Sequence, residues 1–291
     1  MGVYLHRKSI ICTPATSTGW YVAAQSCGAD VGLVDLEDSV APARKAAARA
    51  AAEGYLNPAE VACDLALRIN SPCSSEGLRD LLAAAAYVRR PAIVLIPKVE
   101  SARDVEIVAG ALDSEDYAPE LYAVVETPRG IAQLASIVRA SRLGGLVFGA
   151  ADYALETGAA LRWAPLGFAR SSIANAAGSV GLPAIDSPYF DVRGLDGLRR
   201  EARLARALGY CGKVAVHPCQ VPVINAVFFP SGEEIDRARA IVAAGESAGM
   251  DVAAVDGLMV GAPFFAAASA LVDQVDGDRA AGPAAGGARQ R

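Results

Sequence analysis

The stretch LYAVVETPRGIAQLASIVRASRLGGLVFGAADYALETG, residues 121–158, repeats one pattern: an apolar run, an acidic residue close behind it, and an amphipathic segment. The apolar runs 121–126 and 145–148 have the length and composition of buried strands. The segment 130–140 between them has the composition of a helix that crosses from one strand to the next. Strand–helix–strand units of this kind indicate a parallel sheet covered by helices.

The same alternation continues on both sides of this stretch. Eight strands are predicted, at residues 9–13, 31–35, 65–69, 93–96, 121–126, 145–148, 184–186 and 213–216. Helices are predicted between them, for example at 42–52, 101–111, 130–140 and 195–208. Eight strands, each followed by a helix, favour a closed (β/α)₈ TIM barrel. The dinucleotide-binding pattern G-x-G-x-x-G does not follow the first strand, which disfavours an open doubly wound sheet.

The chain beyond the eighth strand predicts two further parts. We assign residues 1–230 to the barrel and residues 231–275 to a C-terminal helical extension or lid. The extension would contain a helix at 231–248 and an apolar segment at 256–272. Residues 276–291 are rich in Gly, Ala and Arg, and we expect them to be a disordered tail.

Composition limits the functional classes. The chain has 291 residues, 53% of them hydrophobic, a net charge of −5 and a sequence pI of about 5.2. An acidic chain argues against nucleic acid as a partner. The N-terminal apolar run, which ends at Pro14, is too short to span a membrane or to direct secretion. The sequence therefore predicts a cytoplasmic protein with no membrane partner.

The six cysteines contain no C-x-x-C pair and no zinc spacing. We expect them to be reduced and mostly buried, with Cys211 and Cys219 packed as small hydrophobic residues.

Polar residues follow almost every predicted strand. Asp35, Glu37 and Asp38 come after or at the end of the second strand, and Arg68 closes the third. The remaining strand ends carry Lys98 and Glu100, Glu126, Asp152, Asp186 and His217. In a barrel of parallel strands these carboxyl ends form one rim, where the active site lies. The sequence thus predicts a polar site at that rim.

Carboxylates crowded on one rim favour a cation among them. Because no Cys/His cluster that could hold zinc accompanies them, we predict Mg²⁺, held by Glu126 and Asp152, and the same oxygen ligands would suit Mn²⁺. Glu37 and Asp38 are predicted to orient metal-bound water, and Arg68 to bind a substrate carboxylate or oxyanion. Four further residues are predicted to line the substrate site: Thr13, Pro14, Gly149 and Ala150.

Such a site suits enolate chemistry. A 2-oxo acid or hydroxy acid would bind the ion, and the enolate formed on cleavage of a carbon–carbon bond would be stabilised there. The reverse addition would use the same groups. A buried ion pair or helix cap is the alternative interpretation of Glu126 and Asp152.

Several residues have alternative interpretations. Arg68 could bridge carboxylates within the rim, and Asp38 could cap the following helix. Lys98 could be a Schiff-base nucleophile, but nearby acids favour an ion pair. Asp35 is compatible with a hydrogen-bonded group inside the barrel. For His217, a hydrogen-bonded structural role is favoured over that of a general base.

As an ordered set, nine segments resemble the citrate lyase β-subunit/malyl-CoA lyase branch of the HpcH/HpaI aldolase superfamily. They are RSIICTP, GADVGLVDLEDSVAPARKAAAR, LALRIN, PKVESARDVE, VVETPRGI, GLVFGAADYALETGA, GLPAIDSPYFDVR, GKVAVHPCQV and AVDGLMV. The resemblance extends from Ser9 to about Phe265. It implies a Mg²⁺-dependent barrel, trimeric or hexameric, that cleaves or makes 3-hydroxy-acyl thioesters.

The resemblance also implies roles for individual residues. The metal ligands fall on Glu126 and Asp152, the substrate-carboxylate arginine on Arg68, and the partners of metal-bound water on Glu37 and Asp38. These are the residues that the strand ends already indicate.

Two positions depart from the family pattern. Family lyases that work alone on CoA esters often carry an acid in the C-terminal segment, which reaches a neighbouring subunit's site, whereas this chain has Gly261. In the first strand–helix loop the family often has a lysine near the CoA phosphates, whereas no lysine occurs between Pro14 and Lys45. An acyl-CoA or a carrier-bound acyl group therefore both remain candidate partners.

These departures leave two alternatives to a simple lyase. One is a biosynthetic enzyme that condenses an acyl thioester with a 2-oxo acid. The other is a non-catalytic barrel subunit of a larger complex. The apolar segment from Met259 to Phe265 is predicted to be a lid or a subunit contact.

Overall fold

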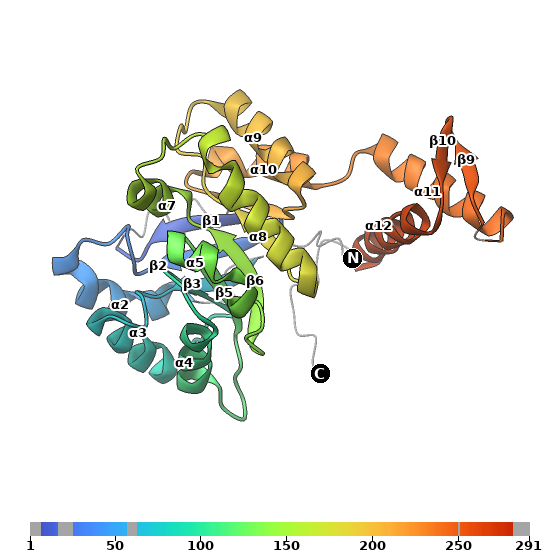
Figure 1. The fold of residues 1–291 in the computed structure, drawn as a ribbon. Helices are drawn as coiled ribbons and strands as arrows, with labels where there is room; N and C mark the ends of the chain where they lie inside the picture. Colours follow the sequence, from blue (N-terminus) through green and yellow to red (C-terminus); the bar gives the residue numbers. More distant parts are fainter. Residues whose placement is uncertain (1–6, 17–25, 57–62, 250, 282–291) are drawn as a thin grey trace.

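Eight parallel strands close into a barrel in the computed structural model, which describes residues 7–16, 26–56, 63–249 and 251–281 (Figure 1). The strands pair in sequence order, and β1 pairs with β8 to close the ring. Their bounds are β1 Ser9–Pro14, β2 Val31–Asp35, β3 Asp64–Arg68, β4 Ile93–Ile96, β5 Glu120–Val125, β6 Leu143–Phe148, β7 Ala184–Asp186 and β8 Gly212–Ala215. The (β/α)₈ prediction is confirmed, and each strand lies within two residues of its predicted position.

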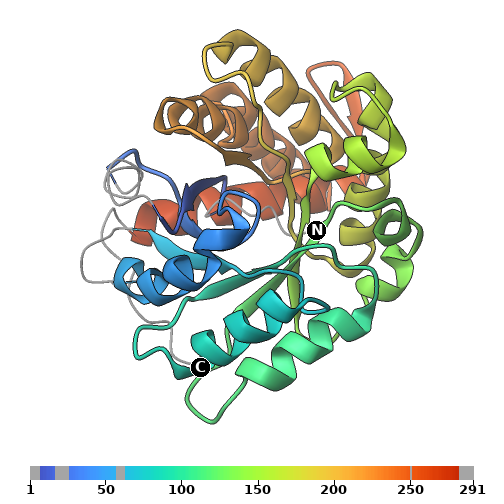
Figure 2. The ribbon, with the colours of Figure 1, turned by 90° about the vertical axis from the view of Figure 1, so that its left-hand side faces the viewer.

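The helices form a ring around the strands, as Figure 2 shows in a view along the barrel. The longer ones are α2 Lys45–Tyr55, α3 Ser75–Ala86, α4 Ala102–Leu112, α7 Ala150–Thr157, α8 Gly167–Val180, α9 Leu195–Leu208 and α10 Val221–Phe228. The described residues also form shorter helical segments: η1 Pro42–Arg44, α5 Pro128–Ala132, α6 Leu134–Ile137, η3 Ala164–Leu166 and η4 Pro218–Gln220.

The helix predicted at 130–140 differs from the structure. It begins earlier, at Pro128, because the Thr127 hydroxyl accepts a hydrogen bond from the Gly130 amide and caps the first turn. It then divides at Gln133 into α5 and α6. The helix predicted at 42–52 starts as the 3₁₀ turn η1 and continues as α2 to Tyr55.

Two apolar layers hold the barrel together. The first layer lies inside the barrel and is formed by side chains such as Leu33, Leu95, Val124, Val147 and Val214. A larger layer fills the space between the strands and the helices. Each fully buried aliphatic side chain contributes about 1.5–3 kcal/mol. The packed interior gives the polar rim a rigid base.

Beyond the barrel, the C-terminal extension projects away from the strands (Figure 1). It consists of α11 Gly232–Ser247, a hairpin of β9 Ala253–Val255 and β10 Leu258–Val260, and α12 Ala262–Ala281. Helices α11 and α12 enclose a small apolar core of their own that includes Ile241, Val260 and Phe265.

The structure of the extension differs from two of the sequence predictions. The apolar segment predicted at 256–272 is part hairpin, because Asp256 and Gly257 adopt φ of 51° and 76° and turn the chain between β9 and β10. Residues 276–281, assigned to a disordered tail, belong to α12. The rest of that predicted tail, residues 282–291, lies outside the described residues. Within the described part of the chain, every helix is too short or too polar to cross a membrane.

Candidate active site

A cluster of charged side chains lies at the carboxyl ends of the strands. Asp35 and Arg68 end β2 and β3, Lys98 follows β4, Glu126 follows β5, and Asp152 lies in the first turn of α7 after β6. The loop after β2 adds two more acids, Glu37 and Asp38. The prediction that these residues meet at one rim is confirmed by the contacts between them, described below.

Arg68 is fixed by Asp35. Its Nε and Nη2 each lie 2.7 Å from the Asp35 carboxylate, which is fully buried and also accepts hydrogen bonds from the Glu37 and Ser39 amides and the Ser39 hydroxyl. Burial alone would raise the pKa of Asp35, but the attraction of Arg68 outweighs it and the pKa is lowered. Asp35 is therefore the hydrogen-bonded interior group that the sequence indicated. Arg68 Nη1 lies 2.9 Å from Glu37, so the guanidinium bridges two rim carboxylates.

Lys98 is surrounded by acids. Its Nζ donates to Glu37 Oε1 at 2.6 Å and lies 3.9 Å from Asp38 and 4.0 Å from Glu126. Burial would lower the pKa of Lys98, but the hydrogen bond and charge of Glu37 raise it above its usual value. The ion pair favoured for Lys98 is present, and because a protonated amine is not a nucleophile this contact argues against the Schiff-base alternative.

Glu126 is the more buried of the two proposed metal ligands, with 1% of its surface exposed. The Lys98 amide donates to its Oε1 at 2.9 Å. A Cβ on Gly149 would lie 2.2 Å from Glu126 Oε2, so the glycine leaves the space that this side chain fills. Burial, with repulsion from Glu37, raises the pKa of Glu126 to about 8.

Asp152 and Glu126 share one site. The Asp152 carboxylate is within hydrogen-bonding reach of both Glu126 and Asp38. Burial first, and then repulsion from Asp38, raise the pKa of Asp152. Asp38 does not cap the following turn, because the N-cap of η1 is Ala41 and has no side-chain hydrogen bond. Its carboxylate faces the cluster.

The cluster carries more negative than positive charge. Asp35, Glu37, Asp38, Glu126 and Asp152 contribute five carboxyl groups, and Arg68 and Lys98 contribute two cations, so the cluster has a formal excess of three negative charges when every acid is ionised. The raised pKa values of Glu126 and Asp152 reflect the cost of that fully ionised state. One buried acceptor, Glu37 Oε2, has no aligned hydrogen-bond donor. That oxygen faces the Arg68 guanidinium at 2.9 Å. A divalent cation between Glu126 and Asp152 would offset the formal negative charge, so the donor set fits Mg²⁺.

The protein supplies few ligands for such an ion. Among the described residues, no group of three or more His, Cys, Asp or Glu side chains is arranged to hold a metal. Mg²⁺ commonly takes only one or two carboxylates and keeps its other positions for water and substrate oxygens. Glu126 and Asp152 meet that requirement.

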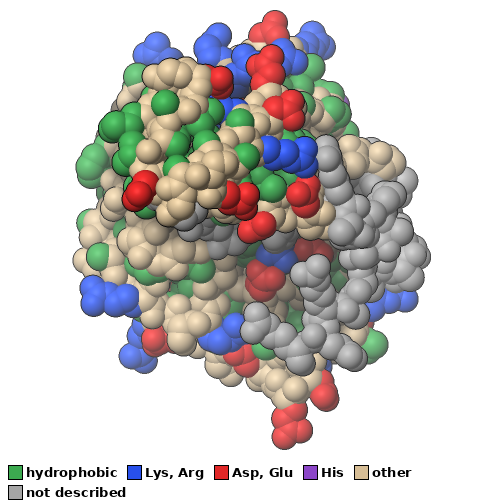
Figure 3. All heavy atoms as spheres, turned by 90° about the vertical axis from the view of Figure 1, so that its right-hand side faces the viewer, with side chains coloured by type: hydrophobic (Ala, Val, Ile, Leu, Met, Phe, Trp, Pro, Cys, Tyr) green, Lys and Arg blue, Asp and Glu red, His purple; other side chains and the backbone are tan. Residues whose placement is uncertain are grey.

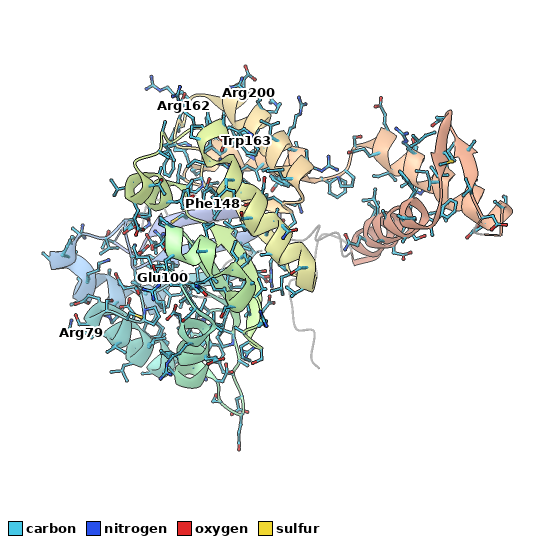
Figure 4. All side chains as sticks on the ribbon, viewed as in Figure 1. Arg79, Glu100, Phe148, Arg162, Trp163 and Arg200 are labelled. Atoms are coloured by element: carbon cyan, nitrogen blue, oxygen red, sulfur yellow. The ribbon has the colours of Figure 1, made fainter. Side chains whose placement is uncertain are left out.

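A cavity of about 340 Å³ opens beside Asp152, and Glu126 is not among its lining residues. Asp38, Arg68 and Asp152 line one part of it, and the barrel-interior side chains form its apolar floor. Phe148, at the end of β6 and labelled in Figure 4, forms part of the wall. Pro188 and Phe190, which follow β7, complete the enclosure.

The residues predicted to line the substrate site are divided. Ala150 lines the cavity, whereas Thr13, Pro14 and Gly149 are not among the described lining residues. Gly149 instead packs beneath Glu126. The sequence prediction missed Phe190, although its place just after β7 in the segment SPYF was a usable signal.

Two other strand-end groups lie outside this cavity. Asp186 is fully buried and pairs with Arg170 at 2.9 Å and Lys213 at 2.5 Å. The Arg170 guanidinium lies over the rings of Phe148 and Trp163. His217 accepts a hydrogen bond from the Cys219 amide, which agrees with a structural role.

The six cysteines are thiols, and the prediction that they are mostly buried holds only in part. Four of them pack partly buried against the apolar core: Cys12, Cys27, Cys63 and Cys211. Cys73 and Cys219 are exposed and the others are partly exposed. The Cys219 thiol lies 3.0 Å from the His217 ring and does not pack in the core.

An α/β barrel with a paired-carboxylate site at the carboxyl ends of its strands defines a class of enzymes that use a metal ion at the barrel mouth. Comparison with known proteins identifies the group. The model of the HpcH/HpaI aldolase/citrate lyase family matches residues 9–218, and that of a carbon–carbon bond lyase of the TIM-barrel fold matches residues 170–275. The chain belongs to the HpcH/HpaI aldolase/citrate lyase family and is an enzyme of the carbon–carbon lyase type.

Individual relatives agree with this assignment. The chain is 33% identical to citrate lyase subunit beta of Escherichia coli K12, over 93% of each chain. It is 34% identical to a (3S)-malyl-CoA thioesterase of Cereibacter sphaeroides, over 87% of this chain and 89% of that one. The structure of CitE from Mycobacterium tuberculosis with magnesium, acetoacetate and coenzyme A is similar with a TM-score of 0.78 and 33% identity, over 92% and 98% of the two chains.

Proposed function

We propose that this protein is a Mg²⁺-dependent carbon–carbon lyase that acts on a hydroxy acid or a 3-hydroxy-acyl thioester. The observation that carries the proposal is the contact between Glu126 and Asp152 in a cluster with an excess of negative charge. The cluster borders an apolar cavity of about 340 Å³, a volume that suits a small ligand. The magnesium bound in the related CitE structure supports the same choice of ion, and Mn²⁺ would suit the same oxygen ligands.

The residues of this chain have distinct roles in the proposed reaction. Glu126 and Asp152 would hold the ion, and Glu37 and Asp38 would accept hydrogen bonds from its water. When bound, Mg²⁺ supplies positive charge where an enolate develops next to a carboxylate. Arg68, held rigid by Asp35, would direct its cavity face towards the substrate carboxylate. The apolar floor excludes water, which strengthens each of these charge interactions.

The acyl partner and the assembly are further parts of the proposal. The coenzyme A in the related structure supports an acyl-CoA substrate, and a carrier-bound acyl group would present the same thioester. We propose a homotrimer or homohexamer in the cytoplasm. Exposed apolar side chains on the extension support a subunit contact, since Val252 is 65% and Met259 is 73% exposed. Figure 3, which faces the extension, shows hydrophobic side chains between charged ones on this side.

The first experiment compares turnover of candidate hydroxy-acyl thioesters with and without EDTA, in the wild type and in Glu126→Gln. A Lewis acid contributes several kcal/mol to such a reaction, so both treatments should lower turnover by about 10²-fold or more. Circular dichroism should show that the variant keeps its fold. Turnover that resists both EDTA and the substitution would exclude the metal role.

A condensing enzyme is the second candidate, and Gly261 favours it. An expected acid is replaced by a residue that cannot move a proton, which points to a changed acyl partner or direction. Product analysis with pairs of 2-oxo acids and acyl thioesters separates condensation from cleavage. If the chain is instead a non-catalytic subunit, a Mg²⁺ titration of the purified protein should detect no binding.

A further inference from the structure

Lys98 adopts a backbone conformation that is unusual for its residue type. Its φ is 54°, and among the described non-glycine residues only Asp256 shares a positive φ. Asp256 lies in a two-residue hairpin turn, where positive φ is expected. Lys98 lies at the end of β4, where no hairpin requires it. A lysine in this left-handed region is strained, and such strain persists only where surrounding contacts enforce it.

The conformation gives both ends of the residue an acidic partner. The backbone amide donates to Glu126 Oε1 at 2.9 Å, and the ammonium donates to Glu37 Oε1 at 2.6 Å. The ammonium also lies 3.9 Å from Asp38 and 4.0 Å from Glu126. One residue therefore contacts three acids of the proposed metal site.

The ammonium is bound but not enclosed. The Lys98 side chain is 38% exposed, whereas Glu37 and Glu126 are 6% and 2% exposed. Lysine carries a compact charge on a flexible stem with several rotatable bonds. The ammonium can therefore swing into solvent while the carboxylates stay in place. Arg68 differs, because its paired hydrogen bonds to buried Asp35 hold it.

We propose that Lys98 is the internal counter-ion of the metal site, and that its ammonium and Mg²⁺ compete for the same carboxylates. In the metal-free enzyme the ammonium stabilises Glu37, Asp38 and Glu126. When the divalent ion binds, the ammonium withdraws from the cluster, while the Lys98 amide keeps Glu126 in position. Lys98 is thus a positioning residue, and the inference rests on the proposed metal site.

The test isolates the ammonium with Lys98→Met, which keeps the backbone amide and a side chain of similar length. EDTA-treated, dialysed protein is titrated with MgCl₂ by calorimetry, and thermal unfolding is measured with and without Mg²⁺. We expect the variant to bind Mg²⁺ about tenfold more tightly, because a positive charge that lies 4.0 Å from the proposed ligand Glu126 is removed. Its melting temperature should fall without metal and recover with it.

Arg129→Met is the matched control. Arg129 lies on the same rim, is 75% exposed and pairs with Glu100 at 3.6 Å, outside the cluster. Its removal deletes the same charge and should leave the Mg²⁺ affinity unchanged. Equal tightening in both variants would indicate a general charge effect and overturn the proposal.

Failure of this inference is distinguishable from failure of the proposed function. A wild type that binds no Mg²⁺ would remove the metal site itself. A wild type that binds Mg²⁺ with an affinity that Lys98→Met leaves unchanged or weakens would overturn the counter-ion role alone. If Lys98→Met does not fold, Lys98→Gly takes its place, because glycine adopts the positive φ without strain and keeps the amide.

Discussion

At the scale of single residues, Gly149 determines whether Glu126 can reach the metal site. A Cβ at Gly149 would lie 2.2 Å from Glu126 Oε2 and 2.4 Å from Glu126 Cβ, and the second atom has no freedom to swing away. We expect Gly149→Ala to displace Glu126 and to weaken Mg²⁺ binding by about tenfold or more, with overpacking that costs about 1–3 kcal/mol of stability. Calorimetric Mg²⁺ titration and thermal unfolding measure the two effects.

Gly110→Ala is the control for this substitution. Gly110 lies in α4, and a Cβ there meets no atom within 4 Å. Alanine in a helix is favoured over glycine, so stability should rise by about 0.5–1 kcal/mol while the Mg²⁺ affinity stays constant. An intact affinity in Gly149→Ala would show that Glu126 is not a ligand or that the cluster adapts.

The pKa of Glu126 predicts how stability depends on pH. Burial raises the pKa from its ordinary value of 4.5 to about 8, so the folded protein binds more protons than the unfolded chain between these values. Stability of the metal-free protein should therefore fall as pH rises from about 4.5 to about 8, and Mg²⁺, which binds the ionised form, should stabilise most at the upper end. Thermal unfolding in EDTA and in Mg²⁺ at several pH values measures this. In a Glu126→Gln variant, the stability of the metal-free protein should depend much less on pH. An equal pH dependence in the variant would show that other groups cause it.

At the scale of elements, the strand ends were predictable and the side-chain pairings were not. Parallel strands in a closed barrel all end on one rim, so the apolar runs alone place Arg68, Glu126 and Asp152 together. The acids that Arg68 pairs with depend on side-chain packing. The sequence offered a bridge between rim carboxylates only as an alternative and could not identify Asp35 and Glu37 as the partners. The positive φ of Lys98 has no local signal, because lysine does not prefer it.

The hairpin of the extension shows a different kind of miss. The dipeptide Asp256-Gly257 is a strong signal for a two-residue turn, yet the surrounding residues 253–260 form an apolar run that hides the strand ends. Likewise α12 continues to Ala281 through residues that composition alone assigns to a tail. Helix α12 packs against α11, and such tertiary contacts can outweigh local composition.

At the scale of the whole molecule, the extension projects from the barrel (Figure 1). Gly261 lies in it between β10 and α12. Nothing in the surrounding structure requires glycine there: its φ is not positive, and an added Cβ would meet only Val252 Cγ2 at 3.7 Å. An aspartate at this position is therefore expected to leave stability within about 0.5 kcal/mol of the wild type. The loss of the acid that the family pattern implies is a chemical change and not a packing requirement.

Gly261→Asp consequently tests how the extension contributes to catalysis. If the extension of one subunit reaches a neighbour's site, the new acid should raise the rate of thioester cleavage by about 10²-fold, because a positioned acid or base usually contributes about that much. Gly261→Asn, which adds a side chain of similar size that cannot move a proton, should leave the rate unchanged. Equal rates in the two variants would exclude this role.

A subunit-mixing experiment then determines in which subunit the acid acts. Wild-type subunits, which lack the acid, are mixed with subunits of a Glu126→Gln, Gly261→Asp double variant, which lack the metal ligand. Activity above that of either parent requires an extension and a metal site from different subunits, whereas additive activity would confine the acid to its own barrel.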